Sequence, residues 1–184
     1  MGYFKSEIVP IHTKIEDANG EEQDIVVDTD DGPRKGTTMA GLAKLKPAFQ
    51  KGGSTTAGNA SQVSDGASAV LLMRRSKAEE LGMPILGAYR GFQVVGVQPD
   101  EMGIGPAAAI PAALAAAGLT VADIDIFEIN EAFASQAAYS VKKLGIPMEK
   151  VNPNGGAISL GHPLGNTGAR MVATLMAELK RQDK

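Results

Sequence analysis

From Ser64 to the carboxyl end, apolar and polar positions follow two different periods. Short apolar runs predict strands, and apolar residues three or four positions apart predict helices. The predicted strands are residues 69–73, 85–97 and 124–129, and the predicted helices are residues 76–82, 106–118, 132–144 and 167–180. Because apolar strands alternate with helices, the pattern predicts a layered α/β core.

Residues near the ends of the predicted helices support these boundaries. Ser76, with Glu79 three positions later, has the spacing of a capping box at a helix start. Pro106 suits the first turn of the alanine-rich helix that stops at Gly118, whereas Pro111 inside this helix is expected to weaken or kink it. The many alanines of this helix predict close packing.

The first fifty residues are richer in charge and follow another pattern. Short alternating runs at 7–15 and 22–29 flank the dipeptide Asn19-Gly20, which is favoured at the tip of a tight hairpin. This part therefore predicts a β-hairpin. A short helical turn is expected at 43–49.

A flexible stretch rich in glycine and hydroxyl side chains, residues 52–59, separates the two parts. We therefore predict an amino-terminal hairpin and loop segment over residues 1–54 and a carboxyl-terminal core domain over residues 55–184. No internal repeat of solenoid length divides the chain further.

Composition excludes several functions. The 184 residues carry a net charge of −3 and scattered basic residues, so no surface for nucleic acid or an anionic membrane is expected. No apolar stretch reaches the roughly 18 residues of a membrane-spanning helix. The chain has no cysteine, which excludes disulfides and thiolate metal sites. The acidic cluster at residues 28–31 lacks the glycine and distal glutamate of a calcium loop, so no metal site is predicted.

His162, one of two histidines, is the leading candidate for chemistry. It lies between Gly161 and Pro163 in a glycine-rich run, where glycine permits close approach of the backbone and proline stiffens it. An imidazole can accept a proton from a nucleophile or donate a hydrogen bond to an oxyanion. A structural role is the alternative for a lone histidine. The other histidine, His12, is expected on the surface of the hairpin.

Asn130 and Glu131 stand between a predicted strand and a predicted helix, where α/β proteins present side chains to ligands. From the residues alone we favour a helix N-cap for Asn130, and Glu131 suits the first turn of a helix. The run at residues 55–61 could place small side chains and hydroxyls beside an extended ligand, or serve as a polar linker. No glycine spacing matches a dinucleotide fingerprint or a P-loop.

Four segments carry recognisable motifs, among them Asn-Glu-Ala-Phe and Gly-His-Pro. They are residues 42–49, 53–66, 125–136 and 155–170. Together they closely resemble thiolases, most closely the peroxisomal type of 3-ketoacyl-CoA thiolase, and imply a thiolase-like layered α/β core. The resemblance covers the carboxyl-terminal half of such an enzyme without its final cysteine motif. It places the nucleophilic cysteine before Met1 and the acid/base cysteine after Lys184.

The resemblance also implies roles for individual residues. His162 would activate the nucleophilic cysteine and line an oxyanion hole, in which Asn130 would position a water. Coenzyme A would bind as a co-substrate, with no permanently bound cofactor and no metal. Its contacts are expected at Arg34, Ala57, Ser61, Ala132 and Phe133.

The implied function is thiolytic cleavage of a 3-ketoacyl-CoA by CoA to acetyl-CoA and a shortened acyl-CoA, as in fatty-acid β-oxidation. The isolated chain is expected to be inactive because both catalytic cysteines are absent. The alternatives are a noncatalytic module that binds CoA or pairs with thiolase subunits, and a biosynthetic acetoacetyl-CoA thiolase. Expected partners are CoA, acyl-CoA thioesters and further copies in a homodimer or homotetramer. The resemblance implies a peroxisomal location, with mitochondrial or cytoplasmic locations as alternatives.

Overall fold

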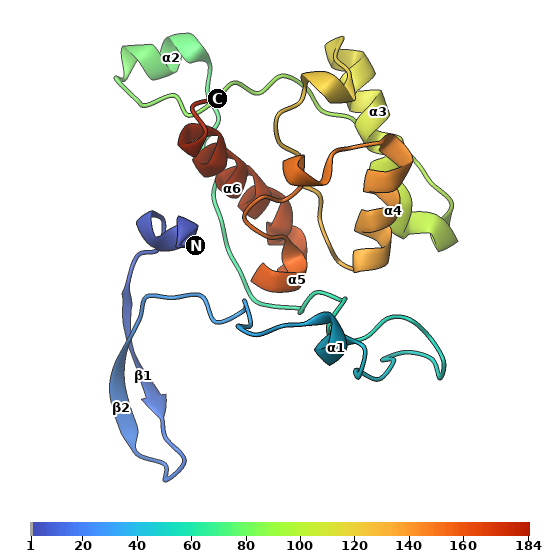
Figure 1. Ribbon diagram of the computed structural model, residues 1–184. Helices are drawn as coiled ribbons and strands as arrows, with labels where there is room; N and C mark the ends of the chain where they lie inside the picture. The colour runs from blue at the N-terminus through green and yellow to red at the C-terminus, as the bar shows by residue number, and fades with distance from the viewer. Residues whose placement is uncertain (1) are drawn as a thin grey trace. The chain divides into compact units, whose positions relative to one another are not determined.

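The computed structural model describes residues 2–184, which form two compact units. The first unit extends to Gly36, and the second comprises Thr37–Lys184. Figure 1 follows the chain through both units. The boundary between the units lies earlier in the chain than the division predicted after residue 54, and that domain division stays a prediction.

The first unit contains the predicted β-hairpin. Strand β1 (Ile11–Glu16) pairs antiparallel with β2 (Glu22–Val27), and Ile11 lies opposite Val27 in the register. A short 3-10 helix, η1 (Tyr3–Ser6), precedes the hairpin. Figure 1 shows the two strands as a pair of neighbouring arrows. The hairpin is thus confirmed, with arms shorter than predicted because the ladder ends at Ile11 and Val27.

Local side-chain bonds explain the hairpin turn. Oδ1 of Asp17 accepts hydrogen bonds from the backbone N–H groups of Asn19 at 2.8 Å and Glu21 at 3.1 Å. Gly20 adopts φ of +84°, a left-handed conformation that glycine reaches without steric cost. The dipeptide Asn19-Gly20 therefore turns the chain, as its sequence predicts.

The regular elements described in the second unit are helices. The α-helices are α1 (Met39–Leu42), α2 (Arg75–Glu80), α3 (Gly105–Ala117), α4 (Ala134–Leu144), α5 (Ala157–Leu160) and α6 (Thr167–Arg181). The 3-10 helices are η2 (Pro99–Ile104), η3 (Val121–Asp123), η4 (Met148–Lys150) and η5 (Leu164–Asn166). The four predicted helices are confirmed as α2, α3, α4 and α6. The helical turn predicted at 43–49 is wrong, because the helix nearest to this range, α1, ends at Leu42.

Most helix ends follow the predicted chemistry. Gly118 and Gly145 close α3 and α4 in the left-handed conformation, with φ of +69° and +64°. Helix α3 continues through Pro111 as one element of 13 residues. The capping box predicted at Ser76 is wrong, because α2 begins one residue earlier and its N-cap, Arg74, makes no side-chain cap bond.

The three strands predicted in the second unit are wrong as regular elements. A strand requires a ladder of hydrogen bonds to a neighbour, and residues 69–73 and 85–97 have no such neighbour among the described residues. Their side chains are accordingly exposed, 72% for Leu71 and 74% for Leu86. Residues 124–129 keep a single parallel bridge, between Phe127 and Val151.

A small apolar core lies in the second unit beneath α4. Its buried members come from the segment before α4, from α4 itself and from the residue after its C-cap. They are Phe127, Ile129, Ala137, Val141 and Ile146. Ile110 of α3 and Val121 of η3 pack against this cluster. The core therefore fixes the segment that leads into Asn130.

Candidate active site

Asn130 and His162 meet in the second unit although 32 positions separate them. Nδ2 of Asn130 lies 3.3 Å from Nε2 of His162. Asn130 directly follows buried Ile129, and His162 comes two residues after the end of α5. The structure thus brings together two residues that the residue pattern alone did not connect.

A second hydrogen bond holds the imidazole of His162 from its other side. Nδ1 lies 2.7 Å from Oγ1 of Thr167, the buried first residue of α6. An amide nitrogen can only donate, so Nε2 of His162 accepts from Asn130 and Nδ1 donates its proton to Thr167. Sequence reasoning missed Thr167. Its position five residues after His162, at a predicted helix start, was the signal that could have found it.

Only the nitrogen of the Asn130 amide has a hydrogen-bond partner among the described residues. Its Oδ1 is buried and has no hydrogen-bond partner among the described residues. Buried polar atoms are nearly always paired with protein or with ordered water. A hydrogen-bond donor from a water or a ligand would satisfy this oxygen.

The structural interpretations of Asn130 and Glu131 are wrong. Helix α4 begins at Ala134, its N-cap is Phe133, and no side chain caps it. Asn130 therefore does not cap this helix, and Glu131 does not lie in its first turn. Glu131 instead turns toward the glycine-rich run: its Oε1 accepts from Nδ2 of Asn152 at 2.7 Å.

The backbone around His162 is fixed by the residues at 62–64. The N–H of His162 donates to the carbonyl of Gln62 at 2.8 Å, within a parallel bridge between His162 and Val63. Gly161 has φ of +94°, and an added Cβ there would lie 2.5 Å from Oγ of Ser64. The close approach predicted at Gly161 is thus to another part of this chain.

Small residues predicted to contact CoA are adjacent in the structure. The N–H and Oγ of Ser61 both donate to the carbonyl of Ala132, at 3.0 and 3.1 Å. Ala60 and Phe133 form an isolated antiparallel bridge. Ser61, Ala132 and Phe133 therefore lie on one short stretch of paired backbone. Of these three, Ala132 and Phe133 directly follow Asn130 and Glu131 in the chain.

The other two predicted contacts are placed differently. Ala57 is exposed in the loop before Ser61. Phe133, one of the three paired residues, packs edge to face on Phe49, with ring centroids 6.1 Å apart and an interplanar angle of 74°. Arg34 is exposed and belongs to the first unit. All five predicted contacts with CoA stay predictions.

A buried ion pair lies beside the candidate site. Oε2 of Glu128 is 3.4 Å from a guanidinium nitrogen of Arg170 on α6, and the Glu128 side chain is 4% exposed. Burial raises the pKa of Glu128 to about 7, with a smaller raising effect from Glu131, whereas Arg170 lowers it. Neither Oε1 of Glu128 nor Nε of Arg170 has a partner among the described residues. The pair is therefore incompletely satisfied.

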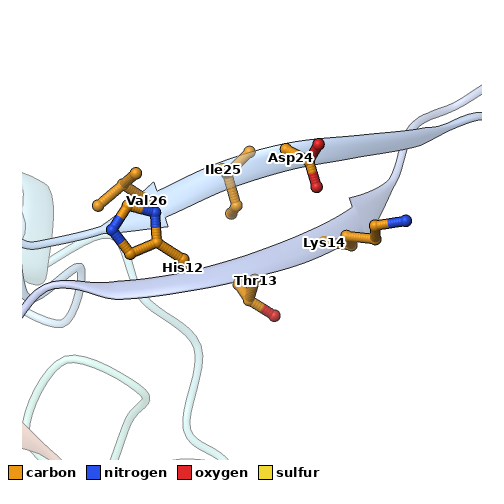
Figure 2. Close-up of a pocket in the computed structure, with 6 residues that line it drawn as sticks. All are labelled: His12, Thr13, Lys14, Asp24, Ile25 and Val26. Carbon is orange, nitrogen blue, oxygen red and sulfur yellow. The ribbon is translucent and has the colours of Figure 1, made fainter.

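The hairpin carries a shallow hollow that is unrelated to these residues. Figure 2 shows its lining side chains on the two strands: His12, Thr13, Lys14, Asp24, Ile25 and Val26. Five of the six residues are exposed. His12 thus lies on the surface of the first unit, as predicted.

Within residues 2–184, no group of three or more histidine, aspartate or glutamate side chains could hold a metal ion. Within the same residues, no helix has the length and apolar character that crossing a membrane requires.

Family models of known proteins match nearly the whole chain. The N-terminal domain of thiolase matches residues 1–76, and the C-terminal domain of thiolase matches residues 83–184, more than half of the chain. The chain belongs to the thiolase family. These matches confirm the resemblance to thiolases that the sequence motifs indicate.

Curated thiolases are similar along the entire chain. Peroxisomal 3-ketoacyl-CoA thiolase A of Mus musculus is 71% identical over 183 residues, which are 100% of this chain and 43% of the mouse protein. The peroxisomal 3-ketoacyl-CoA thiolase of Homo sapiens is 69% identical over 183 residues, with the same two coverages. The chain therefore spans less than half the length of these relatives.

Solved thiolase structures confirm the predicted fold class, a thiolase-like α/β core. The dimeric peroxisomal thiolase of Saccharomyces cerevisiae matches with a TM-score of 0.86 and 57% identity, over 97% of this chain and 44% of the yeast chain. Human mitochondrial 3-ketoacyl-CoA thiolase in complex with CoA matches with a TM-score of 0.88 and 42% identity, over 99% of this chain and 44% of the human chain.

Proposed function

We propose that this chain supplies the histidine and asparagine of an active site that cleaves a 3-ketoacyl-CoA with CoA, giving acetyl-CoA and a shortened acyl-CoA. The observation that carries the proposal is the contact of 3.3 Å between Asn130 and His162, next to a buried amide oxygen without a partner. The similarity to peroxisomal 3-ketoacyl-CoA thiolases supports the reaction class.

The geometry suits the two halves of acyl transfer. Because Nδ1 of His162 carries the ring proton, Nε2 is the acceptor nitrogen. In place of its hydrogen bond from Asn130, Nε2 can accept a proton from a thiol and thereby create the thiolate nucleophile. The resulting Nε2–H can then donate to the oxyanion that forms on the thioester carbonyl. Nδ2 of Asn130, or a water held by this amide, supplies a second donor at the same place.

The sulfur nucleophile is proposed to come from outside these 184 residues. The chain contains no cysteine, and the thiolase reaction proceeds through an acylated sulfur. The site described here is therefore one part of a composite site. We accordingly propose that the isolated chain does not turn over a 3-ketoacyl-CoA.

CoA is proposed to lie along the paired backbone of Ser61 and Ala132. Small side chains at Ala57, Ser61 and Ala132 allow a pantetheine arm to approach the main chain, and Phe133 offers an apolar face next to it. Arg34 is proposed to bind a phosphate of the nucleotide end. A human mitochondrial relative whose structure contains CoA supports this co-substrate.

The decisive test is a chimaera in which this chain replaces the matching segment of the mouse peroxisomal thiolase. His162→Ala and Asn130→Ala should each lower thiolysis of acetoacetyl-CoA about 10²- to 10³-fold, the usual cost of removing an acid/base group or an oxyanion donor. His12→Ala is the matched control and should leave the rate unchanged. Normal turnover in the His162 variant would refute the proposal.

One observation favours a second function, a noncatalytic module that binds CoA. The chain has no cysteine, so CoA binding is the part of the thiolase function that it could perform alone. Calorimetric titration of the isolated chain with CoA tests this. Saturable binding at one site supports the module, and absence of heat beyond dilution excludes it.

Location and assembly are proposed from the relatives. The mouse and human proteins are named as peroxisomal, and the yeast relative is described as dimeric. We infer that the complete protein acts in the peroxisome as a homodimer.

A further inference from the structure

We propose that Glu131 is a positioning residue that holds Asn130 and His162 at their mutual distance. The inference rests on the function proposed for that pair. The sequence predicts Glu131 in the first turn of a helix, but the structure places it before α4, with its carboxylate bonded to Asn152 and Ile158.

Both oxygens of Glu131 receive hydrogen bonds from the glycine-rich run before His162. Oε1 accepts from Nδ2 of Asn152 at 2.7 Å, and Oε2 accepts from the backbone N–H of Ile158 at 3.3 Å. Both partners can only donate, so the site requires two acceptor atoms. A carboxylate provides two, whereas the amide of glutamine provides one.

The carboxylate also has no room to move toward the loop. Gly156 is buried, and an added Cβ there would collide with the carboxylate of Glu131. The glycine thus lets the main chain of the run lie directly against Glu131. This contact limits the separation between the two segments, because Gly156 adds no side chain of its own between them.

Asn152 forms two hydrogen bonds with the backbone of Ile129, the residue before Asn130. Its Oδ1 accepts from the N–H of Ile129 at 2.8 Å, and its Nδ2 donates to the carbonyl of Ile129 at 2.8 Å. Asn152 is buried and has φ of +43°, a conformation that asparagine tolerates better than most residues. The neighbours of Asn130 on both sides are therefore tied to Asn152.

The same network reaches His162. Ile158 belongs to α5, which ends at Leu160, and the N–H of Gly161 donates to the carbonyl of Ala157 at 2.9 Å. Glu131, the residue after Asn130, is therefore hydrogen-bonded to the helical turn that precedes His162. Catalytic groups lose much of their effect when displaced by about 1 Å, so such a connection has a direct consequence for the pair.

The test uses NMR of the full chain with ¹⁵N-labelled histidine. The chain has only His12 and His162, so His12 in the hairpin serves as an internal reference. In the wild type, the ¹⁵N shifts of His162 should report a protonated Nδ1 and an accepting Nε2. Glu131→Gln should change the ¹⁵N shifts of His162 and leave those of His12 unchanged. Glu149→Gln, which removes an equal charge at an exposed position, should leave the shifts of His162 unchanged.

A second variant keeps the proposal falsifiable if Glu131→Gln folds poorly. Glu131→Asp retains the carboxylate on a side chain one methylene shorter, and the His162 shifts should then lie between those of wild type and Glu131→Gln. Wild-type shifts in either folded variant would overturn the proposal. Loss of the folded amide spectrum in both variants would also overturn it, because Glu131 would then support the whole fold.

The readout separates this inference from the proposed function. The ¹⁵N shifts of His162 depend on its hydrogen bonds and require no turnover. If His162→Ala leaves thiolysis normal while the Glu131 variants still change the His162 shifts, only the proposed function is rejected. If the chimaera variants lose activity as expected but the His162 shifts do not change in the Glu131 variants, only the role of Glu131 is rejected.

Discussion

Thr167 and Asn130 hold the imidazole of His162 from its two opposite nitrogens. The bond to Oγ1 of Thr167 measures 2.7 Å, and the contact to Nδ2 of Asn130 measures 3.3 Å. The shorter bond fixes the tautomer because the hydroxyl can accept the Nδ1 proton. Thr167 is the first residue of α6, so the start of this helix sets which nitrogen of His162 carries the proton and which one accepts.

Thr167→Val should therefore impair catalysis without abolishing binding. Valine keeps the shape of threonine but leaves the Nδ1–H of His162 without its acceptor, which costs about 1–3 kcal/mol. In the chimaeric enzyme we expect kcat to fall about tenfold or more with KM nearly unchanged. Thr167→Ser retains the hydroxyl and should stay close to wild type. Equal rates for the valine and serine variants would show that Thr167 does not orient His162.

Gly161→Ala should destabilise the chain. Position 161 has φ of +94°, and the new Cβ would meet Oγ of Ser64. Such backbone strain costs on the order of 1–3 kcal/mol, which a urea titration followed by circular dichroism would measure. Gly165→Ala is the matched control, because nothing lies within 4 Å of an added Cβ there and its φ is not in the left-handed region. Similar midpoints for both variants would contradict the described conformation of Gly161.

The stability of the chain should depend on pH through Glu128. Burial raises the pKa of this carboxyl from its usual 4.5 to about 7 in the folded chain. Between these values the folded chain binds more protons at Glu128 than the unfolded chain does. The free energy of unfolding should therefore fall as pH rises through this window, and the contribution is lost above about pH 7.

Comparison of wild type with Glu128→Gln isolates this contribution. The glutamine variant cannot titrate at position 128, so its urea midpoint should fall less between the lower and upper ends of that pH window. All other titrating groups are common to both proteins. Parallel pH profiles would mean that Glu128 has an ordinary pKa in the folded chain.

Phe127→Ala tests the small core. Phe127 is 8% exposed and belongs to the cluster beneath α4, so its truncation should cost about 3–5 kcal/mol. Phe92 is 72% exposed, and Phe92→Ala should change the stability of the isolated chain by less than about 0.5 kcal/mol. Equal losses measured by denaturant titration would place the core elsewhere.

Helices were predictable from the sequence because their signals are local. The apolar spacing of α4 and α6 and the glycines at positions 118 and 145 lie within or next to the elements that they define. Strands depend on partners that are distant in the chain. The apolar runs at 69–73 and 85–97 therefore could not be tested against a neighbour by pattern alone.

The site was predictable in part for the same reason. His162 was marked by Gly161 and Pro163 beside it, and Asn130 by its position after an apolar run. Asn152 carries no comparable local signal, because its role arises from contacts that the fold creates. Thr167 has only its position at a predicted helix start, and its contact with His162 arises from the fold. Glu131 had a local explanation, the helix dipole, and that explanation pointed to the wrong helix.

The most direct test of the account is a double-mutant cycle on thiolysis by the chimaera. The rates of His162→Ala, Asn130→Ala and the double variant are compared with wild type. If the two residues act as one unit, the double variant should lose little more activity than the worse single variant. Losses in kcat/KM that multiply across the two substitutions would mean that Asn130 and His162 act independently, which would contradict the paired site.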